Sequence, residues 1–320
     1  MSVRMPAPAA ARRSLRPRLV GRYSPGLLCL IMAGLLWGTG GLTGSLLGRT
    51  AGLSALAVAA YRLTTGGALL VVFLTAAGRR WPASRAAWTR IAAVGLLAAL
   101  FQSCYFCAVA LTSVSLATLV TIGSAPVIVQ AASRVLRRPS RSRPATTCLA
   151  LGGLALLVGV PTGGLRESAV LASAGLAVLA ASGFAALTLL GEKPVAGLDE
   201  LSTIGFGFLA GGAVLMAVAA VTSGAGFAPH PDVIGLIIAL GTGPTAVAYT
   251  LYFRGLRTTN ASTGALLSLL EPLTATVLAV LLLGNRLSVT GVAGALLLGI
   301  AVFMTARGHW APEDGGDAVS

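Results

Sequence analysis

Charged residues are scarce in this chain of 320 residues, where Asp, Glu, Lys and Arg make up 10% and apolar residues 56%. A soluble domain carries about 25% charged residues, because it must cover its core with a hydrated surface. Histidine is scarcer still, with two residues, and the acidic residues number nine. This composition excludes an ordinary soluble globular protein and indicates a chain that lies in lipid.

The sequence also lacks the common motifs of enzymes and metal sites. It contains no Walker motif, HExxH, GxSxG or Asp-rich cluster, so no ATP hydrolysis or metal-dependent hydrolysis is predicted. The four cysteines fall within apolar stretches, and the CxxC of Cys104 and Cys107 has no second ligand pair for zinc. We therefore expect no cofactor, no metal site and no enzymatic activity, and we interpret the cysteines as packing residues.

Long apolar stretches are abundant, and ten of them fill the chain. Each is close to the roughly 20 residues that a helix needs to cross a hydrocarbon core about 30 Å thick. Because the stretches are continuous rather than alternating, they predict helices and not barrel strands. The sequence thus predicts an all-α integral membrane protein of ten transmembrane helices. The predicted spans are 27–47, 53–77, 91–110, 113–133, 145–161, 169–190, 202–222, 233–253, 260–283 and 288–306.

The basic residues indicate how the chain crosses the membrane. If the N-terminus is cytoplasmic, the cytoplasmic segments hold 19 of the 23 Lys and Arg residues and the outer loops hold three. This bias predicts a multi-pass inner-membrane protein with both termini in the cytoplasm, where we expect 1–24 and 308–320 to be disordered. The net charge of +14 then reflects topology, and no nucleic-acid partner is predicted, since no basic stripe interleaved with aromatic residues occurs.

The chain repeats itself at a spacing of 146 residues, which relates Pro126 to Pro272 and holds without gaps over the neighbouring spans. Each half, 27–161 and 169–306, therefore has five spans. Because five is odd, the two halves cross the membrane in opposite senses. Inverted repeats are typical of secondary transporters, which place a binding site near the midplane at the repeat interface. We therefore predict two inverted five-helix repeats and a small-molecule substrate.

Several segments resemble the EamA-type proteins of the drug/metabolite transporter superfamily. They are LLWGTG (35–40), AAYRLTTGGALL (59–70), TSVSLATLVTIGSAPVIV (112–129), GTGPTAVAYTLYFRGLR (241–257) and TTNASTGALLSLLEPLTATVLAVLLLGNRLS (258–288). The resemblance implies a ten-helix carrier whose central cavity is lined by the first four helices of each half, with the fifth and tenth as supports. It also implies amino acids or amphipathic drug-like compounds as substrates. One departure is Ala125, which stands where the second half has Glu271.

Two charged residues fall inside predicted spans, where a charge is costly and usually faces a cavity or a partner. Glu271 is either a carboxylate that binds substrate or couples transport to protons, or a structural group that satisfies backbone atoms freed by Pro272. Arg62 either binds an anionic group such as a carboxylate, or snorkels to the interface or pairs with helix-end carbonyls. The sequence leaves both alternatives open.

Polar and aromatic residues recur at helical spacing in three spans, the third, the eighth and the ninth. Such a face either lines a cavity or forms interhelical hydrogen bonds, and a buried aromatic residue either lines a cavity or packs. The spacing of Gly34 and Gly38 favours close approach of another helix. The candidates for the cavity wall, besides Arg62 and Glu271, are Trp37, Gln102, Tyr105, Thr242, Thr245, Tyr249, Tyr252 and Ser268.

Two functional hypotheses follow. The first is a secondary transporter that exports small organic metabolites across a bacterial inner membrane by alternating access, either coupled to protons or as a facilitator. The second is a lipid-handling or non-transporting membrane assembly partner, which would bind an amphiphile without metabolite flux. Monomer and homodimer both remain open, since two fused halves reduce the need for a second chain.

Overall fold

The structure is a computed structural model that describes residues 24–137, 144–159, 166–284 and 286–307. The two segments expected to be disordered lie outside these residues, apart from Ser24. Over the described ranges the chain is α-helical and has no β-strand, so the predicted all-α class is confirmed. The helices are α1 (Pro25–Ala51), α2 (Ala55–Ala76), α3 (Arg85–Leu111), α4 (Val114–Val135), α5 (Pro144–Val158), α6 (Glu167–Gly191), α7 (Glu200–Thr222), α8 (Pro231–Gly241), the π-helix η1 (Thr242–Val247), α9 (Ala248–Leu256), α10 (Ala261–Leu267), α11 (Leu270–Leu283) and α12 (Val289–Arg307).

Each predicted span matches one of these helices or helical segments, with ends that differ by up to six residues, the largest difference being at the start of α3. Among the described residues, nine segments are long and apolar enough to cross a membrane, and α5 is a shorter apolar helix of 15 residues. Several helices begin at a polar side chain that accepts a hydrogen bond from the first turn, as N-cap residues do. These caps are Ser24, Ser54, Ser84, Ser113, Asp199 and Asn260.

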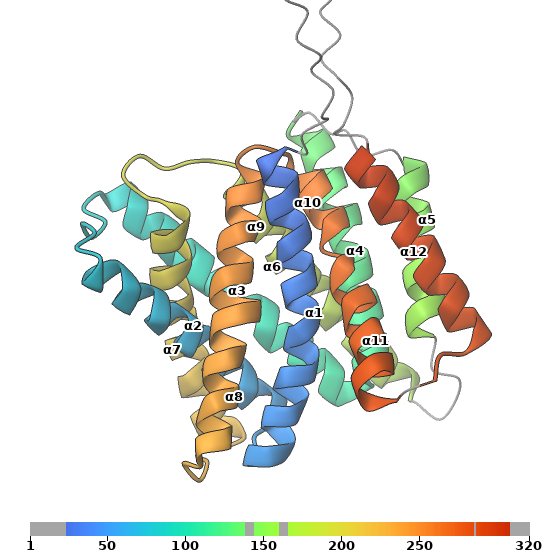
Figure 1. Ribbon diagram of the computed structural model, residues 1–320, viewed down its shortest axis with the longest axis horizontal. Helices are drawn as coiled ribbons and strands as arrows, with labels where there is room; N and C mark the ends of the chain where they lie inside the picture. Colours follow the sequence, from blue (N-terminus) through green and yellow to red (C-terminus); the bar gives the residue numbers. More distant parts are fainter. Residues whose placement is uncertain (1–23, 138–143, 160–165, 285, 308–320) are drawn as a thin grey trace, which may run out of the picture.

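Packing between the helices follows the two-fold relation of the halves. The second helix of one half packs on the second of the other (α2 on α7), and the fifth packs on the fifth (α5 on α12). Correspondingly, α1 packs on α9 and α11, while α6 packs on α3 and α4. The pair α5 and α12 forms the right-hand edge of Figure 1, away from α1 at the centre. This exchange of partners is what two inverted repeats produce, so the predicted architecture is confirmed.

Glycines allow the two halves to approach closely. A methyl group at Gly67 of α2 would lie 2.3 Å from the amide nitrogen of Leu209 on α7. On α1, a methyl group at Gly34 would lie 2.8 Å from the carbonyl oxygen of Leu267, and one at Gly38 would lie 2.4 Å from Cβ of Thr274. The spacing of Gly34 and Gly38 therefore serves close helix packing, as predicted.

The eighth span is interrupted by η1, and Pro244 is the physical reason. Proline has no N–H, so the carbonyl oxygen of Leu240 loses its helical donor four residues on. The hydroxyl of Thr245, five residues on, donates to that oxygen instead, at 2.8 Å. The wider π turn rotates Thr242 out to the exposed surface, away from the buried Thr245. The expectation that Thr242 shares the inward face is therefore wrong.

The ninth span is interrupted at Ser268 and Leu269, between α10 and α11. Pro272 cannot donate to the carbonyl oxygen of Ser268, and the main-chain N–H of Glu271 does so instead, at 3.0 Å. The corresponding span of the first half, α4, runs through Pro126 without interruption. The second half thus contains two interrupted helices side by side in the chain, and discontinuous helices commonly carry the binding site of a transporter.

Candidate functional site

Arg62 connects the two halves at the π-helix. From α2, its Nε donates to Oγ1 of Thr245 at 3.0 Å, and its Nη2 lies 3.3 Å from the carbonyl oxygen of Pro244. A π turn leaves carbonyl groups without their usual donors, and a guanidinium group offers five donors in a fixed fork. Arg62 as a whole is half-buried.

Glu271 lies in the first turn of α11 and is also half-buried. The carbonyl group that Pro272 frees is already bonded to main-chain N–H, so the carboxyl group is not needed for that structural purpose. Within the described residues, the carboxyl group of Glu271 makes no hydrogen bond or ion pair.

The charges of Arg62 and Glu271 act on one shared region. Arg62 lies close enough to Glu271, Tyr105 and Tyr249 for its charge to act on all three. Tyr105 is half-buried like the two charged residues, and its hydroxyl group bonds to Oγ1 of Thr118 at 2.7 Å. The structure therefore brings together four of the residues that the sequence predicted separately.

Aromatic rings pack beside this region around Trp37, which is 2% exposed. The Trp37 ring centroid lies 4.9 Å from that of Tyr249 and 4.8 Å from that of Tyr252. Phe184 of α6 adds a third ring at 5.9 Å. The hydroxyl group of Tyr252 bonds to Oγ1 of Thr188 at 2.9 Å. Such edge and tilted contacts fix the rings in place, so this layer is a packed wall.

Two of the candidate residues carry a buried donor that has no hydrogen-bond partner among the described residues. They are Nε1 of Trp37 and Nε2 of Gln102, in side chains that are 2% and 3% exposed. Buried polar groups are nearly always hydrogen-bonded, so an unpartnered donor requires an explanation, such as a ligand that supplies the acceptor. Ser268 differs, since its hydroxyl group donates to the carbonyl oxygen of Ala265 at 2.8 Å and belongs to the helix interruption.

Sequence reasoning missed Phe184 and Thr188 of α6 and Phe208 of α7, whose ring lies 4.7 Å from that of Tyr249. Phe184 and Thr188 are four residues apart on α6, so the helical spacing that marked the other faces was available there and was overlooked. A metal centre does not emerge either, since the described residues contain no group of three His, Cys, Asp or Glu that could hold one. The chemistry available is a cation, a carboxyl group, two free donors and aromatic surface.

Comparison with known proteins adds to this geometry. The profile of the EamA-like transporter family matches residues 24–159 and 171–307. YwfM, an uncharacterised transporter of Bacillus subtilis, is 30% identical over 281 residues, which are 87% of this chain and 90% of that protein. Protein PecM of Dickeya dadantii is 29% identical over 178 residues, which are 54% and 56% of the two chains. One crystal structure matches with a TM-score of 0.74 at 22% identity, over 89% of this chain and 99% of that one, and shows the fold alone.

Proposed function

The chain belongs to the EamA-like transporter family, and on that premise we propose that it exports small organic metabolites by alternating access. It is a multi-pass membrane transporter. The proposed substrates are amino acids or drug-like compounds, the proposed membrane is the bacterial inner membrane, and both termini lie in the cytoplasm in this proposal. The proposed transport involves no chemical step and no cofactor.

The observation that carries the proposal is the pair of opposite charges, Arg62 and Glu271, inside the membrane-spanning part. One comes from each half, both are half-buried, and their charges interact. A charge held within the bilayer is costly and is usually retained for function. The pair therefore supports a polar substrate site between the halves, where an inverted-repeat transporter is expected to have it.

The surroundings of this pair favour an amphipathic small molecule. Trp37 and Gln102 offer buried donors that need an acceptor, and the aromatic wall offers apolar surface. A carboxylate could accept from Arg62 and from these donors, while Glu271 could receive an ammonium group or a proton. Because the carboxyl group of Glu271 has no fixed partner among the described residues, a proton is available for exchange there, and we assign the coupling role to this group.

Flux in proteoliposomes tests the proposal. Purified protein is reconstituted and supplied with a pool of labelled amino acids and cationic dyes, with and without a pH gradient. Accumulation that depends on the gradient is the expected result, and equilibration without accumulation would replace coupling by facilitated transport. If no soluble compound moves but labelled phospholipids exchange between leaflets, the transport proposal fails in favour of lipid handling.

The variant Glu271→Gln tests the coupling role. Because glutamine cannot carry the proton, we expect gradient-driven accumulation to be lost while passive equilibration of the same compound continues. The matched control is Glu167→Gln, which changes an exposed glutamate in the first turn of α6 and should leave accumulation intact. Normal accumulation by Glu271→Gln, with an unchanged pH dependence, would contradict the coupling role.

A further inference from the structure

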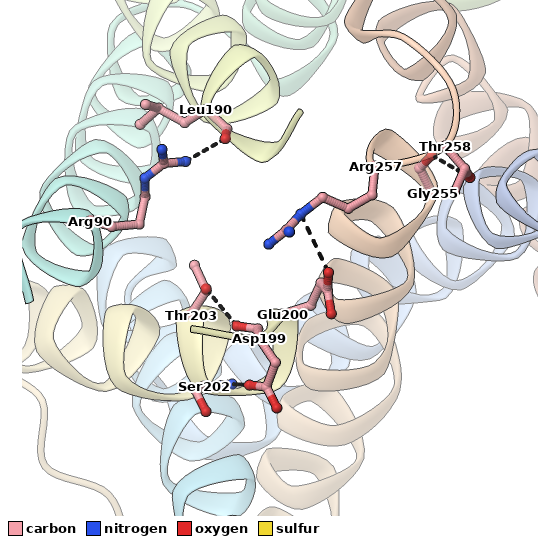
Figure 2. Close-up of polar contacts among 9 residues, drawn as sticks. All are labelled: Arg90, Leu190, Asp199, Glu200, Ser202, Thr203, Gly255, Arg257 and Thr258. Atoms are coloured by element: carbon pink, nitrogen blue, oxygen red, sulfur yellow. Dashed lines mark hydrogen bonds and ion pairs between the residues drawn. The ribbon is translucent and has the colours of Figure 1, made fainter. Parts of the chain in front are cut away.

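Polar contacts join several helix ends at one end of the bundle, where α3 and α7 begin and α6 and α9 end (Figure 2). Arg90 of α3 donates through Nη1 to the carbonyl oxygen of Leu190 in the last turn of α6. Nε of Arg257, just after α9, lies 3.3 Å from Oε1 of Glu200, the first residue of α7. We call these four residues, Arg90, Leu190, Glu200 and Arg257, the clasp.

The clasp holds two positively charged side chains, Arg90 and Arg257, near each other. The guanidinium groups of Arg90 and Arg257 lie close enough to repel each other. Arg90 is held by the carbonyl oxygen of Leu190, which also accepts from the main-chain N–H of Lys193 at 3.1 Å and lies at the negative end of the helix dipole. Arg257 is held by Glu200, and the two side chains are 21% and 24% exposed, so solvent screens them only in part. The contact from Arg90 to Leu190 joins the first half to the second.

The space beside the clasp is closed. It is bounded by the clasp residues Arg90, Leu190 and Arg257 together with Thr203 and Phe253, among others, and it has no room for a water molecule. Further into the protein, the wall of Trp37 and its neighbouring rings is buried as well. The residues around the clasp are therefore closely packed in the conformation observed.

The equivalent place in the other half is a shallow groove that is open to the surface. The spacing of 146 residues relates Arg90 to Leu236 and Arg257 to Leu111, so both cations of the clasp are replaced by leucine. At this opposite end, where α1 ends and α8 begins, a groove of about 480 Å³ is lined by residues that include Leu46, Thr50 and Leu236. Two places related by the repeat are thus in different states.

We propose that the clasp is a gate, and that opening it between α3 and α6 is coupled to closing the groove between α1 and α8. The proposal rests on the proposed function, because it assigns the closed and open ends of an alternating-access cycle. Two inverted halves can exchange conformations, so the state of one place becomes the state of the other. Breaking the clasp should then shift the protein toward the opposite state.

Cysteine labelling of the full chain in lipid nanodiscs tests the gate. The four native cysteines are replaced by alanine, and one probe cysteine is added, either Thr203→Cys beside the clasp or Leu46→Cys in the groove. Thr203 is 3% exposed and Leu46 is 50% exposed. The rate of reaction with a fluorescent maleimide is measured in each background. The test variant is Arg90→Ala, and the matched control is Arg85→Ala, an exposed arginine five residues earlier on α3.

Loss of one hydrogen bond to a charged group shifts an equilibrium by about tenfold or more. Starting from a preference of about 10:1 for the observed state, Arg90→Ala should speed labelling at Thr203→Cys by about fivefold and slow it at Leu46→Cys by about twofold. Arg85→Ala should change neither rate. Unchanged labelling rates in Arg90→Ala would overturn the gate. Faster labelling at Thr203→Cys without slower labelling at Leu46→Cys would also overturn it, because that result means that only the helices around the clasp have loosened.

Metabolite flux of the same proteins separates this inference from the proposed function. Flux in the protein that retains the clasp, together with labelling that is not reciprocal in Arg90→Ala, would leave transport intact and refute the gate. Reciprocal labelling without flux of any compound would support the gate as a conformational device and refute the proposed transport.

Discussion

Substituting Gly67 by alanine should destabilise the protein, because it adds a methyl group where α2 and α7 are in main-chain contact. That carbon would lie 2.3 Å from N and 2.8 Å from Cα of Leu209, and 2.9 Å from the carbonyl oxygen of Gly205. Favourable carbon contacts lie at about 3.5–4.0 Å. All three neighbours are main-chain atoms, so no change of side-chain rotamer relieves the overlap. The two helices, and with them the two halves, must separate by about 1 Å, judged against that contact distance.

The expected net cost of Gly67→Ala is about 1–2 kcal/mol. Overpacking in a filled interior costs about 1–3 kcal/mol, and alanine returns about 0.5–1 kcal/mol through its better helix propensity. The assay is thermal unfolding of the purified protein in detergent, where the melting temperature should fall by several degrees. The control is Gly175→Ala on α6, where a methyl group meets nothing within 4 Å. A melting temperature of Gly67→Ala at or above that of the parent would refute the packing argument.

Two further substitutions test the polar contacts by the same assay. Thr245→Val removes both the acceptor of Nε of Arg62 and the donor to the carbonyl oxygen of Leu240, so we expect a loss of about 1.5–3 kcal/mol, while Thr245→Ser should melt near the parent. Tyr252→Phe removes only the bond to Thr188, whose hydroxyl group keeps its main-chain acceptor, so we expect about 0.5–1.5 kcal/mol. Equal losses of unfolding free energy in Thr245→Val and Tyr252→Phe would contradict the argument that the contact with Arg62 contributes more to stability than a neutral hydrogen bond.

The spans could be predicted from the sequence because the hydrocarbon core imposes their length and composition. The helix ends could not, because hydropathy marks the part of a helix that lies in lipid and not the point where helical hydrogen bonding stops. Arg85 and Arg90, which the apolar pattern leaves outside the third span, belong to α3. Arg254, which the same pattern assigns to a short loop, belongs to α9. Polar residues extend these helices past the apolar core.

The sequence predicted which helix faces carry the candidate residues, but it did not predict which of these residues contact one another. Arg62 and Glu271 stand out by charge alone, and the fold brings them close enough for the charge of Arg62 to act on Glu271. The error at Thr242 arose because a spacing of three and four residues assumes an α-helix throughout, whereas Thr242–Val247 is a π-helix. Pro244 was the available signal. Arg90 and Arg257 were counted only as loop charges, since sequence alone does not bring the ends of distant helices together.

The two halves have the same helix arrangement but different side chains at equivalent positions, and this difference distinguishes the two ends of the helix bundle. The same spacing that aligns Pro126 with Pro272 places Ala125 opposite Glu271 and Leu236 opposite Arg90. One end of the bundle therefore closes through the hydrogen bond of Arg90 and the ion pair of Arg257, whereas the corresponding positions at the other end are leucines. Within a bilayer, apolar contact between helices has little advantage over contact with lipid. The polar end should thus be the more stably closed, which agrees with a structure in which the clasp is formed and the opposite groove is open.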